Sequence, residues 1–262
     1  MQNTQLLDAI PIWGMFPMIL LLVLVSVECG FRIGRWRSQK GADVKDASTG
    51  SMVGAVLGLL AFMLAFTFGM VSARYDARRQ AVREEASAVQ TAFLRAGFVP
   101  EPRRAEIRTL LCEYVEARLA AVRQPDIEPV LVRSREIHDR LWAAAAAEAE
   151  KNPGSVAAGL FVQSLNELIE LHTKRVQAAL RGRIPPVITY VLYLLTVLGM
   201  SSMGYLAGLA GKRTHFISGT LAVAFSSVMF LIVDLDRPRE GLLQVSQQVM
   251  IDLQNTLATP RP

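Results

Sequence analysis

The stretch SMVGAVLGLLAFMLAFTFGMV, residues 51–71, continues without a proline or glycine stop into SARYDARRQAVREEASAVQTAFLRA, residues 72–96. The first part is apolar and the second is rich in charge. One helix over both parts would be about 70 Å long, and about 30 Å of helix suffices to cross the hydrocarbon of a bilayer. The sequence therefore predicts an integral membrane protein in which one helix leaves the membrane and continues as a stalk in water.

Composition supports the membrane class. The chain has 262 residues, of which 52% are hydrophobic and 19% are charged. The apolar residues gather in four runs, at residues 10–27, 51–72, 187–210 and 216–233, and we predict four transmembrane helices. Arginines at the ends of these runs supply much of the net charge of +5, so the charge is not read as nucleic-acid binding. We expect the first run to stay in the protein, because no Lys or Arg precedes it and no Ala-x-Ala site follows it.

The segment between the second and third runs predicts a helical domain. It is rich in Ala, Glu, Arg and Leu and is interrupted at residues 97–102, near Pro125 and Pro129, and at residues 152–154. These breaks predict helices to Ala96 and over residues 103–123, 130–151 and 155–182, with no strand pattern. The expected fold is all-α. Its parts are 1–72 with helices one and two, 73–184 as the helical extramembrane domain, 185–235 with helices three and four, and 236–262 as a C-terminal segment.

The motifs of enzymes and of metal sites are missing from the sequence. Cys29 and Cys112 lie far apart with no CxxC, and the three histidines are scattered, which argues against a disulfide framework or a zinc site. There is no nucleophile elbow, glycine-rich phosphate loop or HExxH motif. We therefore expect no enzymatic activity, no cofactor and no metal.

Small and aromatic side chains form two adjacent lines on the second run. A stripe of small residues lies within about 80° of the helix circumference, at Gly54, Gly58, Ala61, Ala65, Gly69 and Ser72. It favours close helix packing. If the stripe packs on a neighbouring helix, then Phe62, Phe66 and Met70 beside it would face a shared axis and form an apolar pore neck that gates ions by dewetting. Phenylalanines that face lipid or core are the alternative.

Arginines crowd the first turns beyond the second run. Arg74 and Arg78, followed by Arg79 and Arg83, would raise the anion concentration at a pore mouth, as an anion vestibule. Alternatively they contact lipid headgroups or pair with Asp76 and neighbouring glutamates. Each four-residue step drifts by about 40° around the helix, so only Arg74 would sit near the Met70 end of a neck.

Two groups of charges close the first and fourth runs. Glu28 stands four residues before Arg32, and Asp234, Asp236 and Arg237 follow the fourth run. Charges at such depth are expensive and are usually paired, so structural ion pairs are the first interpretation. Ion coordination is the alternative.

Three motifs lie near the ends of the first, second and fourth runs. The end of the second run carries Ala73, Tyr75, Asp76 and Arg78. The other two motifs follow spans one and four, as Glu28, Gly30, Arg32, Gly34 and Arg35, and as Asp234 to Pro238, Gly241 and Gln244 to Ser246. The first motif resembles the end of the second transmembrane helix of bestrophins, and the sequence is more closely similar to a family of bacterial proteins described as bestrophin-like. The motifs lie near both ends of the chain and in the central stalk.

This resemblance implies a pentameric anion channel. Its second helices would line an apolar neck, here Phe62, Phe66 and Met70, and its helical domain would enclose a cytoplasmic vestibule. The acidic run that forms the calcium clasp of animal bestrophins is reduced here to Asp234 and Asp236, and Arg239 replaces a more usual aromatic residue. The resemblance therefore does not carry calcium gating over to this chain.

We accordingly predict a homo-oligomer in a lipid bilayer that passes small inorganic ions, with chloride favoured. A non-conducting membrane scaffold or sensory adaptor is the alternative, and cation transport through Glu28 and Asp234 is a third reading. Basic residues lie on both sides of the membrane, including Lys212 and Arg213 in the turn between spans three and four. The positive-inside rule favours a cytoplasmic helical domain in the bacterial inner membrane.

Overall fold

The computed structural model describes residues 10–40, 47–124, 126–151, 153–180, 182–211, 215–237 and 240–259. Over these residues the chain is helical and has no strand, which confirms the all-α prediction. The elements are α1 (Ile12–Gln39), α2 (Ala47–Arg95), η2 (Ala96–Phe98), α3 (Arg103–Arg123), α4 (Glu128–Lys151), α5 (Val156–Leu180), α6 (Pro186–Leu209), α7 (His215–Asp236) and α8 (Gln248–Ala258). Pro125, Asn152, Lys212, Arg213, Pro238 and Arg239, which entered the sequence analysis, lie outside the described residues.

The long helix predicted from residues 51–96 is present as α2, a single helix of 49 residues. Its sequence contains no proline, and the glycines of its apolar part are tolerated in membrane helices. Four helices of the described chain are long and apolar enough to cross a membrane, at Ile12–Gln39, Thr49–Phe98, Pro186–Leu209 and Ser218–Asp236. The prediction of four transmembrane helices is thereby confirmed.

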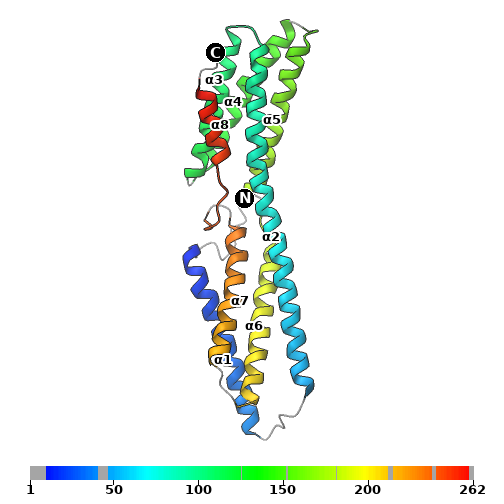
Figure 1. Ribbon diagram of the computed structural model, residues 1–262, viewed down its shortest axis with the longest axis vertical. Helices are drawn as coiled ribbons and strands as arrows, with labels where there is room; N and C mark the ends of the chain where they lie inside the picture. The colour runs from blue at the N-terminus through cyan, green and yellow to red at the C-terminus, as the bar shows by residue number, and fades with distance from the viewer. Residues whose placement is uncertain are drawn as a thin grey trace. The chain divides into compact units, whose positions relative to one another are not determined.

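The chain forms two compact units, which we call the membrane unit (Met1–Tyr75 and Arg183–Gln244) and the helical unit (Asp76–Gly182 and Val245–Pro262). The helix α2 contributes residues to both. In the membrane unit, α1 packs along α6 and α7 (Figure 1). Its apolar core takes side chains from α1, α2, α6 and α7, among them Ile19, Leu60, Leu192 and Met229.

The backbones of α1 and α6 touch at two pairs of glycines. A Cβ atom built on Gly30 would lie 1.9 Å from the carbonyl oxygen of Ser201, and one built on Gly204 would lie 2.0 Å from that of Val27. Gly34 and Gly208 repeat this contact four residues further on. No side chain fits such a gap, so the helices approach closely through a glycine at every fourth residue.

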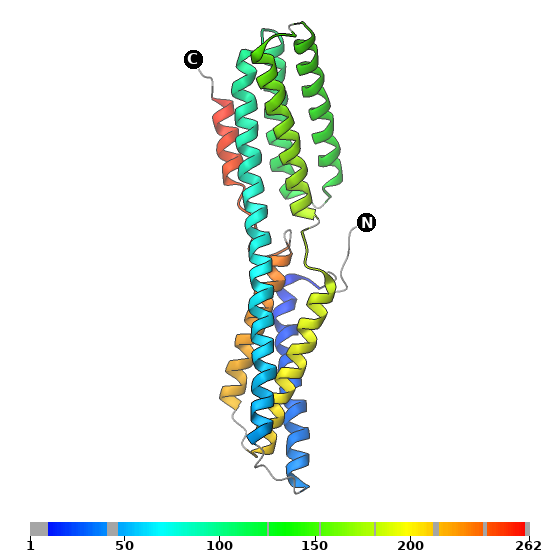
Figure 2. The ribbon, with the colours of Figure 1, turned by 90° about the vertical axis from the view of Figure 1, so that its right-hand side faces the viewer.

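The helical unit packs residues 76–95 of α2 together with α3, α4, α5 and α8 (Figure 2). Its core includes Val89, Leu111, Leu141 and Leu165 from four different helices. The sequence analysis assigned no helix to the C-terminal segment, yet α8 forms there and packs on α3. An 11-residue helix is marginal alone in water, and this one buries Met250 and Leu253 in the core.

Candidate functional site

The two phenylalanines predicted for a pore neck lie on a side of α2 that the chain leaves uncovered. Phe62 is 64% exposed and Phe66 is 58% exposed, and their rings stack with centroids 6.5 Å apart. The opposite side of the helix carries Leu60 and Leu64, which are buried in the core. Met70 is half-buried and packs against that core. The line from Phe62 to Met70 therefore turns from the open side of α2 toward its packed side, as a four-residue spacing requires.

The stripe of small residues on α2 is open as well. A Cβ atom built on Gly54, Gly58 or Gly69 meets nothing within 4 Å among the described residues, and Ala61 and Ala65 are exposed. The close glycine packing of this chain occurs between α1 and α6 instead. The stripe and the two phenylalanines together form a surface of α2 on which no other described part of the chain packs closely.

The arginines predicted for an anion vestibule differ in their surroundings. Arg74 belongs to the membrane unit and is half-buried, whereas Arg78 belongs to the helical unit and is only 6% exposed. Asp76, considered as a partner for such arginines, is exposed. The two arginines are thus not equivalent groups on one open surface.

Glu28 and Arg32 form an ion pair within α1. Arg32 Nε donates to Glu28 Oε1 at 2.9 Å, and both side chains are exposed. The four-residue spacing places the two side chains on the same face of the helix.

The charges after α7 bind backbone groups of the membrane unit. Asp234 accepts hydrogen bonds from the backbone N–H groups of Leu242, at 2.6 Å, and Leu243, at 3.0 Å. Asp236 accepts one from Ile184 at 2.8 Å. Buried Arg237 donates to the carbonyl oxygen of Ile10 at 2.7 Å, and also approaches Glu240 at 3.4 Å. These side chains tie the end of α7 to the following loop, the start of α6 and the start of α1.

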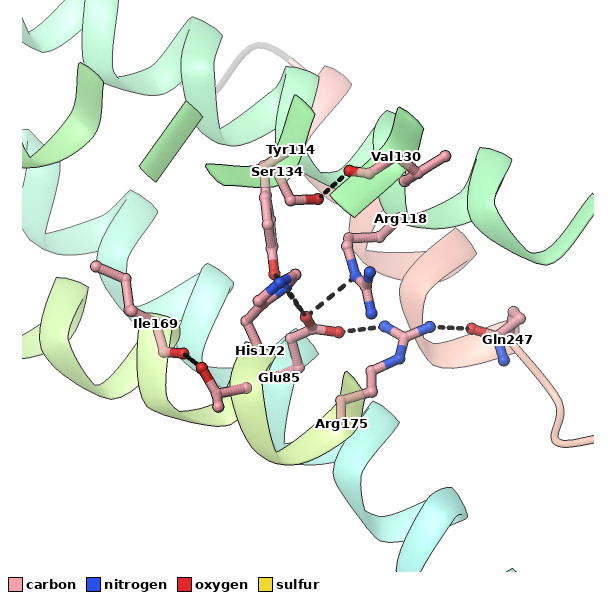
Figure 3. A network of polar contacts seen from close by, with 10 residues as sticks. Glu85, Tyr114, Arg118, Val130, Ser134, Ile169, His172, Arg175 and Gln247 are labelled. Atoms are coloured by element: carbon pink, nitrogen blue, oxygen red, sulfur yellow. Dashed lines mark hydrogen bonds and ion pairs between the residues drawn. The ribbon is translucent and has the colours of Figure 1, made fainter. Parts of the chain in front are cut away.

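A buried polar cluster, which the sequence analysis did not predict, lies in the helical unit (Figure 3). Its centre is the carboxylate of Glu85 on α2, which is 0% exposed. Tyr114 Oη donates to Glu85 Oε1 at 2.5 Å, Arg118 Nε lies 3.2 Å from the same oxygen, and Arg175 Nη1 hydrogen-bonds to Oε2. His172, which contacts Tyr114, and Gln247, which accepts from Arg175, complete this cluster together with His138.

The hydrogen bonds of the cluster assign the tautomer of His172. Its Nδ1 atom lies 2.9 Å from Tyr114 Oη, whose single proton is already donated to Glu85. The Nδ1 atom must therefore carry a proton and donate it to the tyrosine oxygen. His138 packs its ring against both partners, at 5.0 Å from Tyr114 and 4.8 Å from His172 between ring centroids.

Burial and neighbouring charges shift the pKa values of Glu85, Tyr114 and His138 from their usual ranges. Burial raises the pKa of Glu85, but His172, Arg118, Arg175 and Tyr114 together outweigh it and hold that pKa well below its usual range. Burial, followed by the negative charge of Glu85, raises the pKa of Tyr114 well above its ordinary value. Burial, followed by His172, lowers the pKa of His138 to about 4. At neutral pH the cluster therefore holds an ionised Glu85 with a neutral Tyr114 and a neutral His138.

The sequence does contain a signal for this cluster. Glu85 lies in the charged half of α2, beside Glu84, where it reads as a surface partner for arginines. Yet it continues a series of inward positions spaced by three and four residues, at Val82, Val89, Ala92 and Ala96, all of which are buried. A carboxylate within such a series is expected to face the core and to need partners there.

The chain is similar to a known protein family and to solved structures. The family model of the Bestrophin-like domain matches residues 20–250. No curated protein matches the chain. Crystal structures of a bacterial bestrophin homologue from Klebsiella pneumoniae, each with a single substitution, share the fold. One is 17% identical, with coverage of 92% of this chain and 96% of the other at a TM-score of 0.69. A second is 16% identical, with coverage of 94% and 96% at a TM-score of 0.73.

The family match extends over most of the chain, from within α1 to the start of α8, and includes both units. The structural matches cover nearly the full length of both chains. The chain belongs to the Bestrophin-like domain family.

Proposed function

We propose that the protein is an oligomeric channel that conducts anions, with chloride as the main permeant ion. Members of the bestrophin family are anion channels rather than enzymes. The observation that carries the proposal is the open side of α2, where Phe62 and Phe66 stand exposed beside a stripe of small residues. Such a side is available to other copies of the chain.

In the proposed oligomer, several copies of α2 surround one axis. The small residues from Gly54 to Gly69 let neighbouring helices approach, and Phe62 and Phe66 then form rings around the axis, with half-buried Met70 at one end of the neck. Rings of apolar side chains at a constriction exclude water unless the pore widens, so they gate ion flow by dewetting. By resemblance to bestrophins, the number of copies is five.

Arg74 supplies the anion preference at one end of this neck. It follows Met70 by one helical turn and is half-buried. A ring of such cations raises the local concentration of anions. Arg78 is only 6% exposed, so the proposal depends on Arg74 more than on Arg78. We place the channel in the bacterial inner membrane, with the helical unit in the cytoplasm around a vestibule.

Ion flux from liposomes tests this function. Purified protein is reconstituted under a chloride gradient or a potassium gradient, with protein-free liposomes as the blank. We expect chloride-selective flux, and Phe62→Ala with Phe66→Ala should make it faster or remove its gating. Phe68→Ala is the matched control, because Phe68 is also exposed on α2 but points away from the line of Phe62 and Phe66.

Other outcomes would identify the alternatives. A well-assembled oligomer without flux, over a range of voltages and calcium concentrations, would indicate a membrane scaffold. Potassium-selective flux that changes when Glu28 or Asp234 is neutralised would indicate cation transport. Unchanged flux in the Phe62→Ala and Phe66→Ala variants would place the neck elsewhere.

A further inference from the structure

The polar cluster of the helical unit holds more positive than negative charge. Arg118 on α3 and Arg175 on α5 both converge on Glu85 (Figure 3). Of the residues that the structure describes, Glu85 is the one carboxylate that pairs with either guanidinium. Guanidinium groups keep their proton in proteins, and Tyr114 and His138 are neutral at neutral pH. The two guanidinium groups therefore exceed their shared carboxylate by one positive charge.

The two arginines that carry this surplus charge are buried. Arg118 is 3% exposed, and Arg175 is also buried. Burial lowers the pKa of Arg175 and the neighbouring charge of Arg118 lowers it further, while Glu85 opposes both. A buried charge that lacks an opposite charge is strongly destabilising. Glu148 is the other buried carboxylate among the described residues of the helical unit. It stands ten residues from His138 on α4, about 15 Å along the helix, and is too distant to pair with Arg118 or Arg175.

The cluster also contains buried nitrogen atoms that lack a hydrogen-bond partner among the described residues. Arg118 Nη1 is buried and has no hydrogen-bond partner among the described residues, and its Nε approaches Glu85 without the alignment of a hydrogen bond. The Nε2 atom of His138 is likewise buried and unpartnered within the described chain. His138 packs on the ring of Tyr114, with 5.0 Å between ring centroids. Tyr114 Oη donates to the same oxygen of Glu85 that Arg118 Nε approaches at 3.2 Å, so His138 and Arg118 belong to one cluster.

We propose that one monovalent inorganic anion, chloride under cellular conditions, binds in this cluster at Arg118 Nη1. The charge of the ion balances the second guanidinium. The ion accepts a hydrogen bond from Arg118, and a neutral His138 with its proton on Nε2 is placed to donate a second one. A halide is favoured over a larger anion because Arg118, Glu85 and Tyr114 are buried within the packed core of the helical unit, which leaves little room. This site belongs to the helical unit and is separate from the proposed neck.

Bromide diffraction gives the direct test. Crystals of the full-length protein are grown with sodium bromide in place of chloride, and data are collected at the bromine absorption edge. We expect an anomalous peak in contact with Arg118 Nη1. Ordinary density at that position without an anomalous signal would mean that a water molecule takes the place, and this would overturn the proposal, as would anomalous peaks confined to the protein surface.

Thermal unfolding in detergent tests the same site in solution. Chloride replaces gluconate at constant ionic strength, and gluconate is too large for the site. We expect the Tm of the wild-type protein to rise by about 3 °C or more with chloride. Arg118→Gln removes the surplus charge and should abolish this rise. Arg133→Gln is the control, because Arg133 is an exposed arginine that pairs with Glu113 and Glu136, and it should keep the rise.

The wild-type measurement decides the matter even if the variant does not fold. A wild-type Tm that ignores chloride would overturn the proposal. A chloride-dependent rise that persists in Arg118→Gln would also overturn it, because the anion would then bind at another site, such as the neck. Arg118→Lys, which keeps the charge but loses the fork of donors, should retain a smaller rise.

Discussion

The membrane unit and the helical unit are held together by different kinds of contact. In the membrane unit, α1 and α6 approach through glycines until their backbones touch, and charged side chains such as Asp234 bind backbone groups at a helix end. In the helical unit, an apolar core surrounds a cluster of charges centred on Glu85. Lipid offers no hydrophobic drive between helices, so close contact must supply the stability. In the helical unit, burial of apolar side chains stabilises the core, and a paired charge can be enclosed within that core.

The largest effect is expected from Glu85→Ala. It leaves Arg118 and Arg175 buried without their shared carboxylate, which should cost about 3–5 kcal/mol of unfolding free energy in the helical unit. Denaturant unfolding of the purified protein in detergent, followed by circular dichroism, measures this loss. Glu84→Ala is the matched control, because Glu84 is only half-buried and bonds to Gln80 on the same helix. Equal losses for both variants would refute the central role of Glu85.

Gly204→Ala should have the next largest effect, this time in the membrane unit. The added Cβ atom would lie 2.0 Å from the carbonyl oxygen of Val27, and backbone cannot move aside cheaply. We expect a loss of about 3 kcal/mol and a lower yield of folded protein. The comparison is with Gly219→Ala on α7, where a Cβ atom meets nothing within 4 Å. If Gly204→Ala is as stable as Gly219→Ala, then α1 and α6 do not pack through their glycines.

Mild acid should lower the stability of the helical unit more than that of the membrane unit. The pKa of His138 is lowered to about 4 in the folded protein, against 6.5 as its ordinary value. The unfolded chain therefore binds more protons between these values, and the stability contributed by neutral His138 is lost as the pH falls from about 6.5 to 4. We expect a loss of roughly 2 kcal/mol in the helical unit.

The matching variant is His138→Gln, which removes the titrating group. Its unfolding free energy should depend less on pH between 6.5 and 4 than that of the wild-type protein. Because the pKa of Glu85 lies well below its usual range, its contribution is lost only at more acidic pH. A variant whose pH dependence equals that of the wild type would exclude His138 as the source.

Asp234→Asn should have the smallest effect on stability. The amide keeps one oxygen that can accept from Leu242 or Leu243 but loses the negative charge, so we expect a cost of about 1 kcal/mol. Thermal unfolding in detergent measures this cost, and flux from liposomes measures ion selectivity in parallel. Altered selectivity at unchanged stability would favour ion coordination over a structural role.

Much of this architecture could be predicted from the sequence because it depends on local patterns. The apolar runs predict the spans, and the absence of proline in residues 51–96 predicts α2. The helix α8 could not be predicted so easily, because its stability comes from packing Met250 and Leu253 on residues far away in the chain. Periodicity identifies a helix, but it does not identify the partner of that helix.

The candidate site residues were also only partly predictable from the sequence. Glycines on α2 and on α1 look alike in sequence. Gly30 and Gly34 of α1 meet the backbone of α6, whereas a Cβ atom on Gly54 or Gly58 of α2 meets nothing within 4 Å among the described residues. Glu85 and Glu84 are neighbours of the same type, and only Glu85 is enclosed by Tyr114 and the arginines. Which face of a helix is covered depends on tertiary and quaternary contacts, and one sequence does not contain this information explicitly.

Thiol block of single channels tests the central claim that the open side of α2 lines the pore. In a background with Cys29→Ala and Cys112→Ala, Phe66→Cys and Phe68→Cys are each introduced and recorded in planar bilayers. The account predicts a chloride conductance that a charged thiol reagent changes abruptly in Phe66→Cys and leaves unchanged in Phe68→Cys. A conductance that responds at Phe68→Cys but not at Phe66→Cys, or no conductance from assembled protein, would contradict it.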